Sequence, residues 1–446
     1  MTSGILLLFI FVLSIVVIIL LTSRFHLHPF VVLILVCFGV GFASGMPGAE
    51  IVNTIGQGFG NILSYIGLVI VLGTIIGVFL EKSGAALTIA DTIIKLLGAK
   101  RPLLAMSAIG YLVSIPVFCD SAYVILSSLK DTLALKTRRS KIAMSIALAT
   151  GLYATHTLVP PTPGPIAAAA NLGLTHLGMV IVFGLVLAAI AALAGYIWAK
   201  RTERWAPFDV KDFQLDMTDN QLDLPGTGIA LAPIIVPILL ICLGSLARFP
   251  GRPLGEGWVF SGLVFLGAPL VALFFGFVCA LFLLPSFNPK LFSTWVSQGI
   301  QAAAPILVIT GAGGAFGAVL KATPIGDYLG ETLSGLGLGI FLPFVLAAAL
   351  KTAQGSSTVA LVTSSAMVAP LLGTLGLASE VGRVLAVMAI GAGAMTVSHA
   401  NDSYFWVVSQ FSDMDVPAAY KSHTLATLIQ GVVALIFVFL LSLIFV

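Results

Sequence analysis

Residues 151–165 read GLYATHTLVPPTPGP, and they follow the apolar run KIAMSIALAT at residues 141–150. The apolar run is typical of the first half of a membrane-spanning helix, but the prolines after it remove backbone donors and stop the helix. Such a break is tolerated in a bilayer only beside protein or water, because lipid cannot satisfy the freed backbone groups. The stretch therefore predicts a broken helix whose open ends contact a solute. A proline kink that only shapes packing is the alternative.

The composition of the chain indicates a membrane protein. Of its 446 residues, 59% are hydrophobic and only 9% are charged, and the mean hydropathy is +1.11. A soluble domain carries about a quarter charged residues, so we predict an all-α polytopic membrane protein embedded in the lipid bilayer. The net charge is +3, and the basic residues lie in short loops, which indicates no nucleic-acid partner.

The sequence contains no motif of enzymatic chemistry. Its four cysteines are single and lie in or beside apolar runs, which indicates neither a disulfide framework nor a metal site. The run GAGGAFG at residues 311–317 has Phe316 at the last glycine position of GxGxxG, and no strand precedes it. There is also no GxxxxGK(S/T), HExxH or GxSxG sequence. We therefore expect no cofactor, no metal and no enzyme activity.

Apolar runs divide the chain into two membrane halves. Candidate spans lie at about 4–22, 29–46, 63–82, 102–118, 121–135, 142–175 and 177–199, and then at 228–248, 258–284, 303–320, 339–351, 357–376, 383–412 and 423–446. A long polar connection at 200–225 separates the halves. We expect N-terminal scaffold helices at 1–62, a first repeat at 63–199, a cytoplasmic linker with scaffold helices at 200–302, and a second repeat at 303–446.

The bias of lysine and arginine toward the cytoplasm predicts the orientation of the chain. If the N-terminus lies outside, the inner loops collect 16 of the 21 basic residues, whereas the opposite orientation reverses the ratio. The five basic residues that then lie outside or within the membrane are Arg248, Arg252, Lys321, Lys351 and Arg383. An external N-terminus is therefore expected.

The second half of the chain repeats the first at an offset of 240 residues. The overlay places Gly73 and Gly77 on Gly313 and Gly317, Asp91-Thr92 on Glu331-Thr332 and, with a few residues of slippage, Thr155-His156 on Ser398-His399. Seven candidate segments separate the starts of the two copies, so the copies should cross the membrane in opposite senses. The paired glycines predict faces for close helix packing. Inverted repeats with broken helices are typical of secondary transporters, whose binding site lies near the midplane.

The second copy has its own polar interruption, MTVSHANDSYFW at residues 395–406. It gathers several polar side chains between two apolar arms: Ser398, His399, Asn401, Asp402 and Ser403. An ionisable group at membrane depth costs several kcal/mol unless it is paired, hydrated or neutralised. Asp402 is therefore a candidate functional acid, and an external loop in which it is only solvated is the alternative.

Two short segments are typical of re-entrant hairpins, which enter and leave the membrane on one side. SIPVFCDSAYVIL at residues 114–126 carries Asp120 alone in an apolar run, where it could load and release a proton; a buried structural ion pair is the alternative. ALKTAQGSSTVALV at residues 349–362 carries Lys351 and a tip that could bind an oxyanion through amides and hydroxyls. The tip residues are Gly355, Ser356, Ser357 and Thr358. Helix capping by Ser356 or Ser357 alone is the alternative interpretation of that tip.

The two histidines at the breaks, His156 and His399, could relay protons or bind hydroxyl groups. A hydrogen bond between helices is the alternative role for each.

Over essentially the whole chain, HTLVPPTPGP, GAGGAF, GSSTVA and SHANDSYFW resemble the gluconate:proton symporter family of GntP-type gluconate permeases. Members of that family are permeases of the bacterial inner membrane for gluconate and related sugar acids, with one branch for D-serine, and they belong to the ion-transporter superfamily. The resemblance implies an elevator-type homodimer, in which a transport domain with two hairpins and two broken helices slides against a scaffold. In that membrane the expected N-terminus is periplasmic.

The resemblance also implies roles for single residues. The family's acid in the first hairpin corresponds to Asp120, although the family has an aromatic residue and Glu where this chain has Cys119-Asp120. The family's PPHPGP appears here with Thr162 in place of histidine. The basic residue before the hairpin tip corresponds to Lys351, and the SHxND segment to Ser398, His399, Asn401 and Asp402. Both departures lie in the expected pocket and bear on which acid is carried.

We therefore predict a secondary active transporter for proton-coupled uptake of gluconate or a related small sugar acid. The substrate would be bound by His156, Thr162, Lys351, Gly355, Ser356, Ser357, Thr358, Ser398, His399 and Asn401, and the proton by Asp120, with Asp402 as second candidate. Sodium coupling is an alternative, because hydroxyls, amides and carbonyls at helix breaks also bind sodium. Transport of D-serine or a short hydroxy acid is another. An anion channel would need more polar residues to line a pore.

Overall fold

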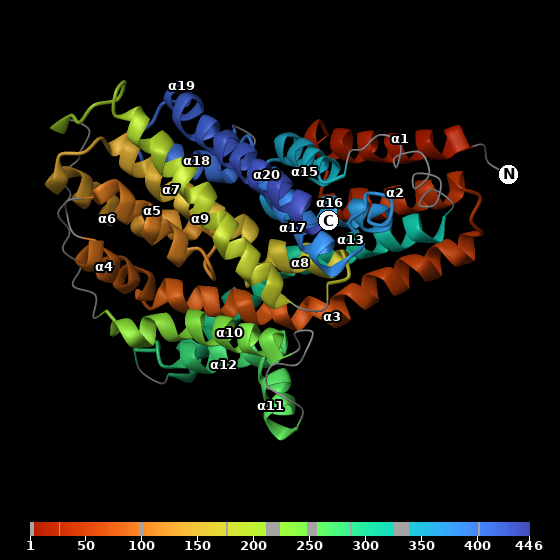
Figure 1. The fold of residues 1–446 in the computed structure, drawn as a ribbon, viewed down its shortest axis with the longest axis horizontal. Coiled ribbons are helices and arrows are strands. Elements are labelled where there is room, and N and C mark those ends of the chain that lie inside the picture. The colour runs from red at the N-terminus through yellow and green to blue at the C-terminus, as the bar shows by residue number, and fades with distance from the viewer. Residues whose placement is uncertain are drawn as a thin grey trace.

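The computed structural model describes residues 4–25, 27–97, 101–174, 177–210, 224–247, 257–285, 288–323, 339–399 and 402–446. All regular secondary structure in these ranges is helical, so the predicted all-α class is confirmed. The helices form an elongated body with α1 (Gly4–Ser23) and α2 (Pro29–Ala43) at one end and α4 (Ala85–Leu97) and α6 (Cys119–Thr137) at the other (Figure 1). Within the described ranges, five helices are long and apolar enough to span a membrane, or up to seven if each of two bent pairs is one span.

The first half runs from α1 to α9. Its helices are α1 (Gly4–Ser23), α2 (Pro29–Ala43), α3 (Gly48–Lys82), α4 (Ala85–Leu97), α5 (Pro102–Val113), α6 (Cys119–Thr137), α7 (Lys141–Leu158), α8 (Pro163–Asn171) and α9 (Leu177–Thr202). The second half contains α10 (Thr227–Ala247), α11 (Trp258–Leu266), α12 (Pro269–Leu281), α13 (Pro289–Ala322), α15 (Phe341–Gln354), α16 (Ser357–Val368), η2 (Ala369–Leu371), α17 (Glu380–Ala394), α18 (Ser403–Gln410), α19 (Val416–Ala419), the π-helical turn η3 (Tyr420–Thr424) and α20 (Leu425–Phe445).

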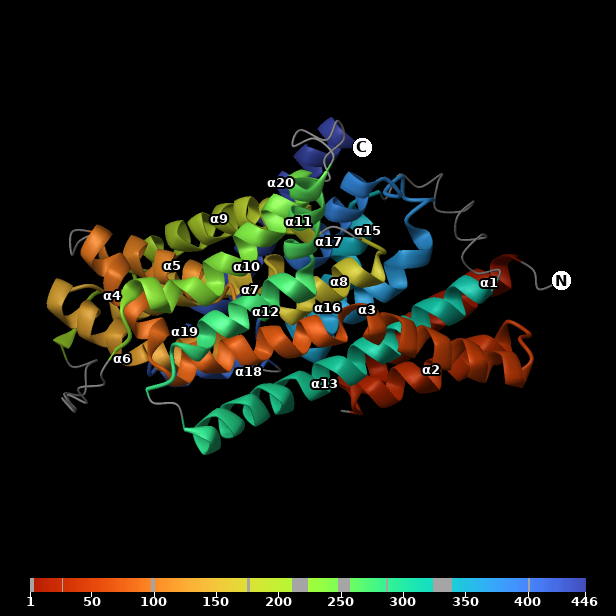
Figure 2. The ribbon, with the colours of Figure 1, turned by 90° about the horizontal axis from the view of Figure 1, so that it is seen from below.

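Two long helices, α3 and α13, run side by side through the molecule (Figure 2). They begin at Gly48 and Pro289, before the apolar spans that hydropathy marks at residues 63 and 303. The difference arises because hydropathy detects only the apolar part of a helix, whereas backbone hydrogen bonds continue through polar residues. At Gly58 the two helices touch so closely that an added Cβ would lie 2.7 Å from the Gly314 carbonyl oxygen.

The order of helices after α13 parallels the order after α3. In the first half, α4 is followed by the hairpin α5–α6, the broken helix α7–α8 and the closing helix α9. In the second half, the hairpin α15–α16, the broken helix α17–α18 and the closing helix α20 follow in the same order. Each hairpin packs against the broken helix of the other half: α16 contacts α8, and α6 contacts α18. Segments from the two halves therefore meet in the middle of the molecule.

The prolines of the opening stretch do interrupt a helix, and the interruption is buried. Helix α7 ends at Leu158 and α8 begins at Pro163. The apolar window of this broken span is 94% buried in the protein, against 22% for the span that contains α20. The break is therefore surrounded by protein, which is where freed backbone groups can find partners.

The glycines that the internal overlay pairs lie where the long helices meet the hairpins and breaks. A Cβ on Gly77 of α3 would lie 2.8 Å from the carbonyl oxygen of Pro116, in the loop of the first hairpin. A Cβ on Gly317 of α13 would lie 3.3 Å from the carbonyl oxygen of Ala366 in α16. The predicted close packing is thus present, and the nearest partners of Gly77 and Gly317 are backbone atoms rather than flexible side chains.

Candidate functional site

A buried ion pair joins the tip of the second hairpin to the second helix break. Lys351 lies in the last turn of α15 with no solvent exposure, and its Nζ is 2.5 Å from Asp402 Oδ2. The same ammonium donates to the carbonyl oxygen of Gly355 at 2.6 Å. Two charges inside a membrane protein are stable only when they are paired and hydrogen-bonded. The alternative of a merely solvated Asp402 is therefore wrong, since its side chain is only 5% exposed.

Asp402 also caps α18. Its Oδ1 accepts from the amide of Tyr404 at 3.1 Å, and its Oδ2 accepts from the Ser398 hydroxyl at 2.5 Å. Capping suits this position, because Asp at an N-cap satisfies an amide that has no acceptor within the helix. His423 Nε2, from the turn η3, lies 3.1 Å from the Ser398 hydroxyl oxygen. The carboxylate is thus held by several partners and is oriented before any ligand arrives.

The tip of the second hairpin joins α15 to α16 through a left-handed glycine and a capping serine. Gly355 ends α15 in the left-handed conformation, with φ of 80°, where a side chain would be strained. The Ser356 hydroxyl then accepts from the Val359 amide at 3.3 Å and caps α16. Ser357 and Thr358 form the first turn of α16, so their amides have no acceptor within the helix. Capping by Ser356 therefore occurs, and it uses the Val359 amide rather than those of Ser357 and Thr358.

Asp120 lies in the first turn of α6, at the tip of the first hairpin. Its Oδ1 atom is buried and has no hydrogen-bond partner among the described residues. Asp402 and Lys351 are the charged groups close enough to act on it electrostatically. The fold therefore brings both candidate acids and the predicted lysine into one cluster, although they come from α6, α15 and the start of α18.

His156 belongs to the same interior region. It lies near the end of α7 and is 5% exposed, and its Nδ1 atom has no hydrogen-bond partner among the described residues. Its ring lies between Tyr153, at 6.5 Å between ring centroids, and Phe118, at 6.0 Å. An unsatisfied buried nitrogen of this kind calls for a water or a ligand.

Other predicted residues are less clearly part of the cluster. Thr162 is buried, but its hydroxyl donates to the Val159 carbonyl at 2.6 Å within the first break. His399 Nε2 lies 2.9 Å from the Thr352 carbonyl oxygen, on the more open side of the hairpin. Asn401 lies outside the described residues. The geometry therefore joins Lys351 and Asp402 directly and leaves Thr162 and His399 at the edge.

Two tyrosines that sequence reasoning missed form the wall beside the ion pair. Lys351 Nζ lies 5.8 Å from the Tyr153 ring centroid, a distance suited to a cation–π contact. Tyr404 packs on Tyr153 at 5.1 Å between ring centroids, and its hydroxyl donates to the Ala149 carbonyl at 2.9 Å. Both tyrosines lie in stretches already marked by helix breaks, so an aromatic residue beside a break was the available signal. His423 had no such local signal.

The described residues contain no group of three His, Cys, Asp or Glu side chains placed to hold a metal ion. The cluster gathers one buried cation, two carboxyl groups, the first-turn amides of α16 and an imidazole nitrogen with no described partner. These groups can bind a small organic anion and hold a proton.

Comparisons with known proteins also point to a transporter. Residues 6–444 match the sequence pattern of the GntP family permeases. A gluconate permease of Pseudomonas aeruginosa is 34% identical over 97% of this chain and 96% of its own, and the D-serine transporter DsdX of Escherichia coli K12 is 34% identical over 96% of both. Among solved structures, the YdaH transporter of Alcanivorax borkumensis has a TM-score of 0.60 at 17% identity, covering 88% of each chain. The Neisseria gonorrhoeae antimetabolite efflux pump MtrF has a TM-score of 0.65 at 16% identity, covering 87% of this chain and 83% of its own. These last two show a shared transporter fold only.

Proposed function

The chain belongs to the GntP family of permeases, a family of bacterial multi-pass membrane proteins, and on that premise we propose that it takes up gluconate or a related small hydroxy-monocarboxylate together with a proton. The observation that carries the proposal is the buried ammonium of Lys351 at a hairpin tip, beside the carboxylate of Asp402. Charged groups within membrane proteins mark the paths of ions and polar substrates. A substrate carboxylate needs such a cation.

The substrate carboxylate is proposed to lie between Lys351 and the first turn of α16. The amides of Ser357 and Thr358 lie in the first turn of α16 and have no acceptor within that helix, and the helix dipole there also favours an anion. Gly355 has no side chain to block the approach. The hydroxyl groups of the substrate would then meet the polar residues around the breaks: His156, Thr162, Ser356, Ser398, His399 and Asn401.

Asp120 is proposed to carry the proton. Asp402 already balances the charge of Lys351, and Asp120 has no cation of its own among the described residues. A substrate anion added to two ionised carboxylates would place three negative charges around one ammonium. A proton on Asp120 removes one of these charges, so each anion enters more favourably with a proton than without one. Asp402 is the second candidate, since its protonation would free Lys351 for the substrate.

The transport step is proposed to be an elevator motion of a homodimer with its N-termini in the periplasm. The helices after α3 and after α13 follow in the same order, which supports two repeats. We take the repeats to be inverted because seven candidate segments, an odd number, separate their starts in the sequence. The close glycine contacts of α3 and α13 with the hairpins and breaks mark the surface along which the site would slide.

D-serine is the second candidate substrate, because one observation favours it. A zwitterion brings an ammonium group as well as a carboxylate, and Asp120 offers a buried carboxyl oxygen with no described partner. The relative named as a D-serine transporter is also as similar to this chain as a relative named gluconate permease, at 34% identity.

The test is uptake of labelled gluconate and D-serine by the purified protein in liposomes. Proton-coupled uptake should be driven by an inward proton gradient, stop when a protonophore collapses it, and remain unchanged when choline replaces sodium. Uptake that survives the protonophore but stops in choline would show sodium coupling instead. If neither compound is taken up nor raises the melting temperature of the protein in detergent, the proposed substrate class is wrong.

A further inference from the structure

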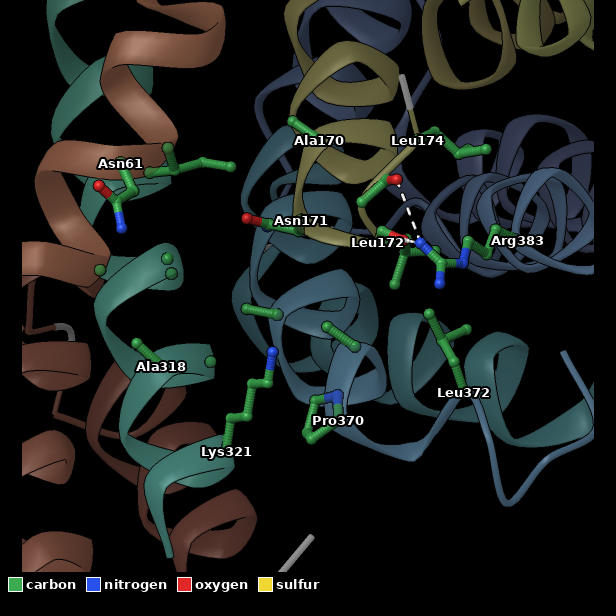
Figure 3. A pocket seen from close by; sticks show the side chains of 18 of the residues that line it. Asn61, Ala170, Asn171, Leu172, Leu174, Ala318, Lys321, Pro370, Leu372 and Arg383 are labelled. Atoms are coloured by element: carbon green, nitrogen blue, oxygen red, sulfur yellow. Dashed lines mark hydrogen bonds between the residues drawn. The ribbon is translucent and has the colours of Figure 1, made fainter. Parts of the chain in front are cut away.

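A large cavity among the described residues lies away from the ion pair, and none of the proposed substrate-binding residues lines it. It has a volume of about 710 Å³ and lies between two walls (Figure 3). One wall is formed by α3 and α13, and the other by the end of α8, the end of α16 with η2, and the start of α17. The cavity is therefore a cleft between the long helices and the hairpin region.

Both charged side chains among the described lining residues of this cleft are cationic. Lys321 and Arg383 line it, and no aspartate or glutamate is among its described lining residues. Lys321 is exposed in the last turn of α13 and has no ion pair or hydrogen bond with a described side chain. Figure 3 shows the ammonium of Lys321 extending toward the wall that carries Asn171 and Pro370. Its charge therefore has no described counter-ion in the cleft.

Hydrogen bonds hold the Arg383 side chain in place, but one of its nitrogen atoms has no described partner. Its Nη1 donates to the carbonyl oxygens of Leu172 at 3.3 Å and Gly173 at 3.1 Å, and its Nε donates to Ala378 at 3.0 Å. Nη2 makes no hydrogen bond within the described part of the chain. One edge of the guanidinium thus binds carbonyl groups at the end of α8. The other edge keeps a donor, held in a fixed position, that could bind an anion.

Two asparagine side chains in the cleft add polar groups that could bind the hydroxyl groups of a ligand. Asn171 uses Nδ2 to bind Val362 and Ser365, at 3.0 and 2.9 Å, which leaves its Oδ1 as an acceptor, and Figure 3 shows that oxygen directed into the cleft. Asn61 lies on the facing α3 wall, exposed to the same space. A cation with neighbouring amides suits a hydroxylated carboxylate better than a simple inorganic anion.

The sequence gives an independent reason to regard these cations as functional. The positive-inside bias places most basic residues in inner loops, and Lys321 and Arg383 are two of the five exceptions. A third exception, Lys351, forms the buried ion pair. The exceptions in the described residues therefore lie either at the proposed site or in this cleft.

We propose that the cleft is a capture subsite on the periplasmic side, where Lys321 and Arg383 hold the carboxylate of the substrate before it reaches Lys351. This inference rests on the proposed function for the identity of the substrate and for the side of the membrane. The subsite raises the local concentration of the anion through long-range attraction. The phosphate of an anionic lipid has the same chemistry, so the test has to separate the two sources.

The experiment compares initial uptake by wild-type protein, Lys321→Gln, Lys321→Arg and the control Lys290→Gln in liposomes at low and high ionic strength. Lys290 is also exposed but lies at the opposite end of α13. Lys321→Gln should raise KM by about three- to ten-fold at low ionic strength with little change in kcat, because it removes attraction and not the transport step. The difference in KM between Lys321→Gln and wild type should become smaller at high ionic strength, because salt screens the charge of Lys321. Lys321→Arg and Lys290→Gln should behave like wild type.

An unchanged KM for Lys321→Gln at low salt, in a protein that transports, overturns the subsite. Equal effects of Lys290→Gln and Lys321→Gln do the same, because they would reflect net charge only. If wild type itself transports neither gluconate nor D-serine, the proposed function fails, and that result is distinct. Liposomes with and without phosphatidylglycerol identify a lipid phosphate in the cleft. An effect of Lys321→Gln that appears only with the anionic lipid, and in kcat rather than KM, would contradict substrate capture.

Discussion

Lys351 at the end of α15 and Asp402 at the start of α18 form an ion pair with 2.5 Å between Nζ and Oδ2, although 51 positions separate them in the chain. Both side chains are almost completely buried, so each depends on the other for its charge. The pair ties the tip of the second hairpin to the second helix break. Movement of the hairpin or a change in either charge must therefore affect both elements.

Removing one member of this pair should damage stability more than removing both. Lys351→Gln leaves the carboxylate of Asp402 buried without its cation, which should lower the free energy of unfolding by about 3–5 kcal/mol. The double variant Lys351→Gln with Asp402→Asn should recover much of that loss, because two neutral amides can bond to each other. Thermal unfolding in detergent measures both. Transport should be absent from both variants, and transport by the double variant would contradict the role of Lys351.

Asp120→Asn should uncouple the movement of the substrate from the movement of the proton. The amide resembles the protonated acid, so substrate exchange across the membrane should continue while uptake driven by a proton gradient falls at least tenfold. Liposome counterflow and gradient-driven uptake measure the two activities. Asp91→Asn is the control, because Asp91 is an exposed member of an i,i+4 pair with Lys95, worth a few tenths of a kcal/mol. Full gradient-driven uptake by Asp120→Asn would assign the proton elsewhere, with Asp402 as the next residue to test.

Ser356→Ala and Ser379→Ala distinguish capping from binding. Each serine caps a helix, with its hydroxyl 3.3 Å from the Val359 amide and 3.0 Å from the Gly382 amide, respectively. Each substitution should therefore cost about 1 kcal/mol of unfolding free energy. Only Ser356→Ala, at the hairpin tip, should also raise the KM for uptake. If both variants lose stability and neither changes KM, Ser356 is a cap and nothing more.

Gly77→Ala should obstruct the contact between α3 and the first hairpin. The new Cβ would meet the Pro116 carbonyl oxygen at 2.8 Å, and backbone atoms cannot rotate away, so we expect a loss of about 1–3 kcal/mol and slower transport. Gly60→Ala on the same helix is the control, since nothing lies within 4 Å of its added Cβ. That change should be neutral or slightly stabilising, because alanine favours a helix. Equal behaviour of the two variants would mean that the contact at Gly77 is not tight.

Features with a local cause could be predicted from the sequence. The prolines after residue 159 stop α7 wherever the helix lies, and Gly355 with Ser356 ends one helix and caps the next. The starts of α3 and α13 could not be placed, because their first turns are polar and hydropathy reports only the apolar part. Residues 395–406 were recognised as a polar interruption, but the sequence did not show that Asp402 caps α18.

The sequence by itself determined the membrane class, the helix breaks and the charged residues that have to be buried or hydrated. These follow from hydropathy and backbone chemistry, which act within a few residues of the chain. Only the tertiary structure decided which partners those residues have: Asp402 for Lys351, the Tyr153 ring beside the ammonium, and His423 beside Ser398. It also decided that Lys321 and Arg383 share one cleft. Such contacts depend on how α13, α15, α17 and η3 pack, and packing is set by the shapes of many distant side chains at once.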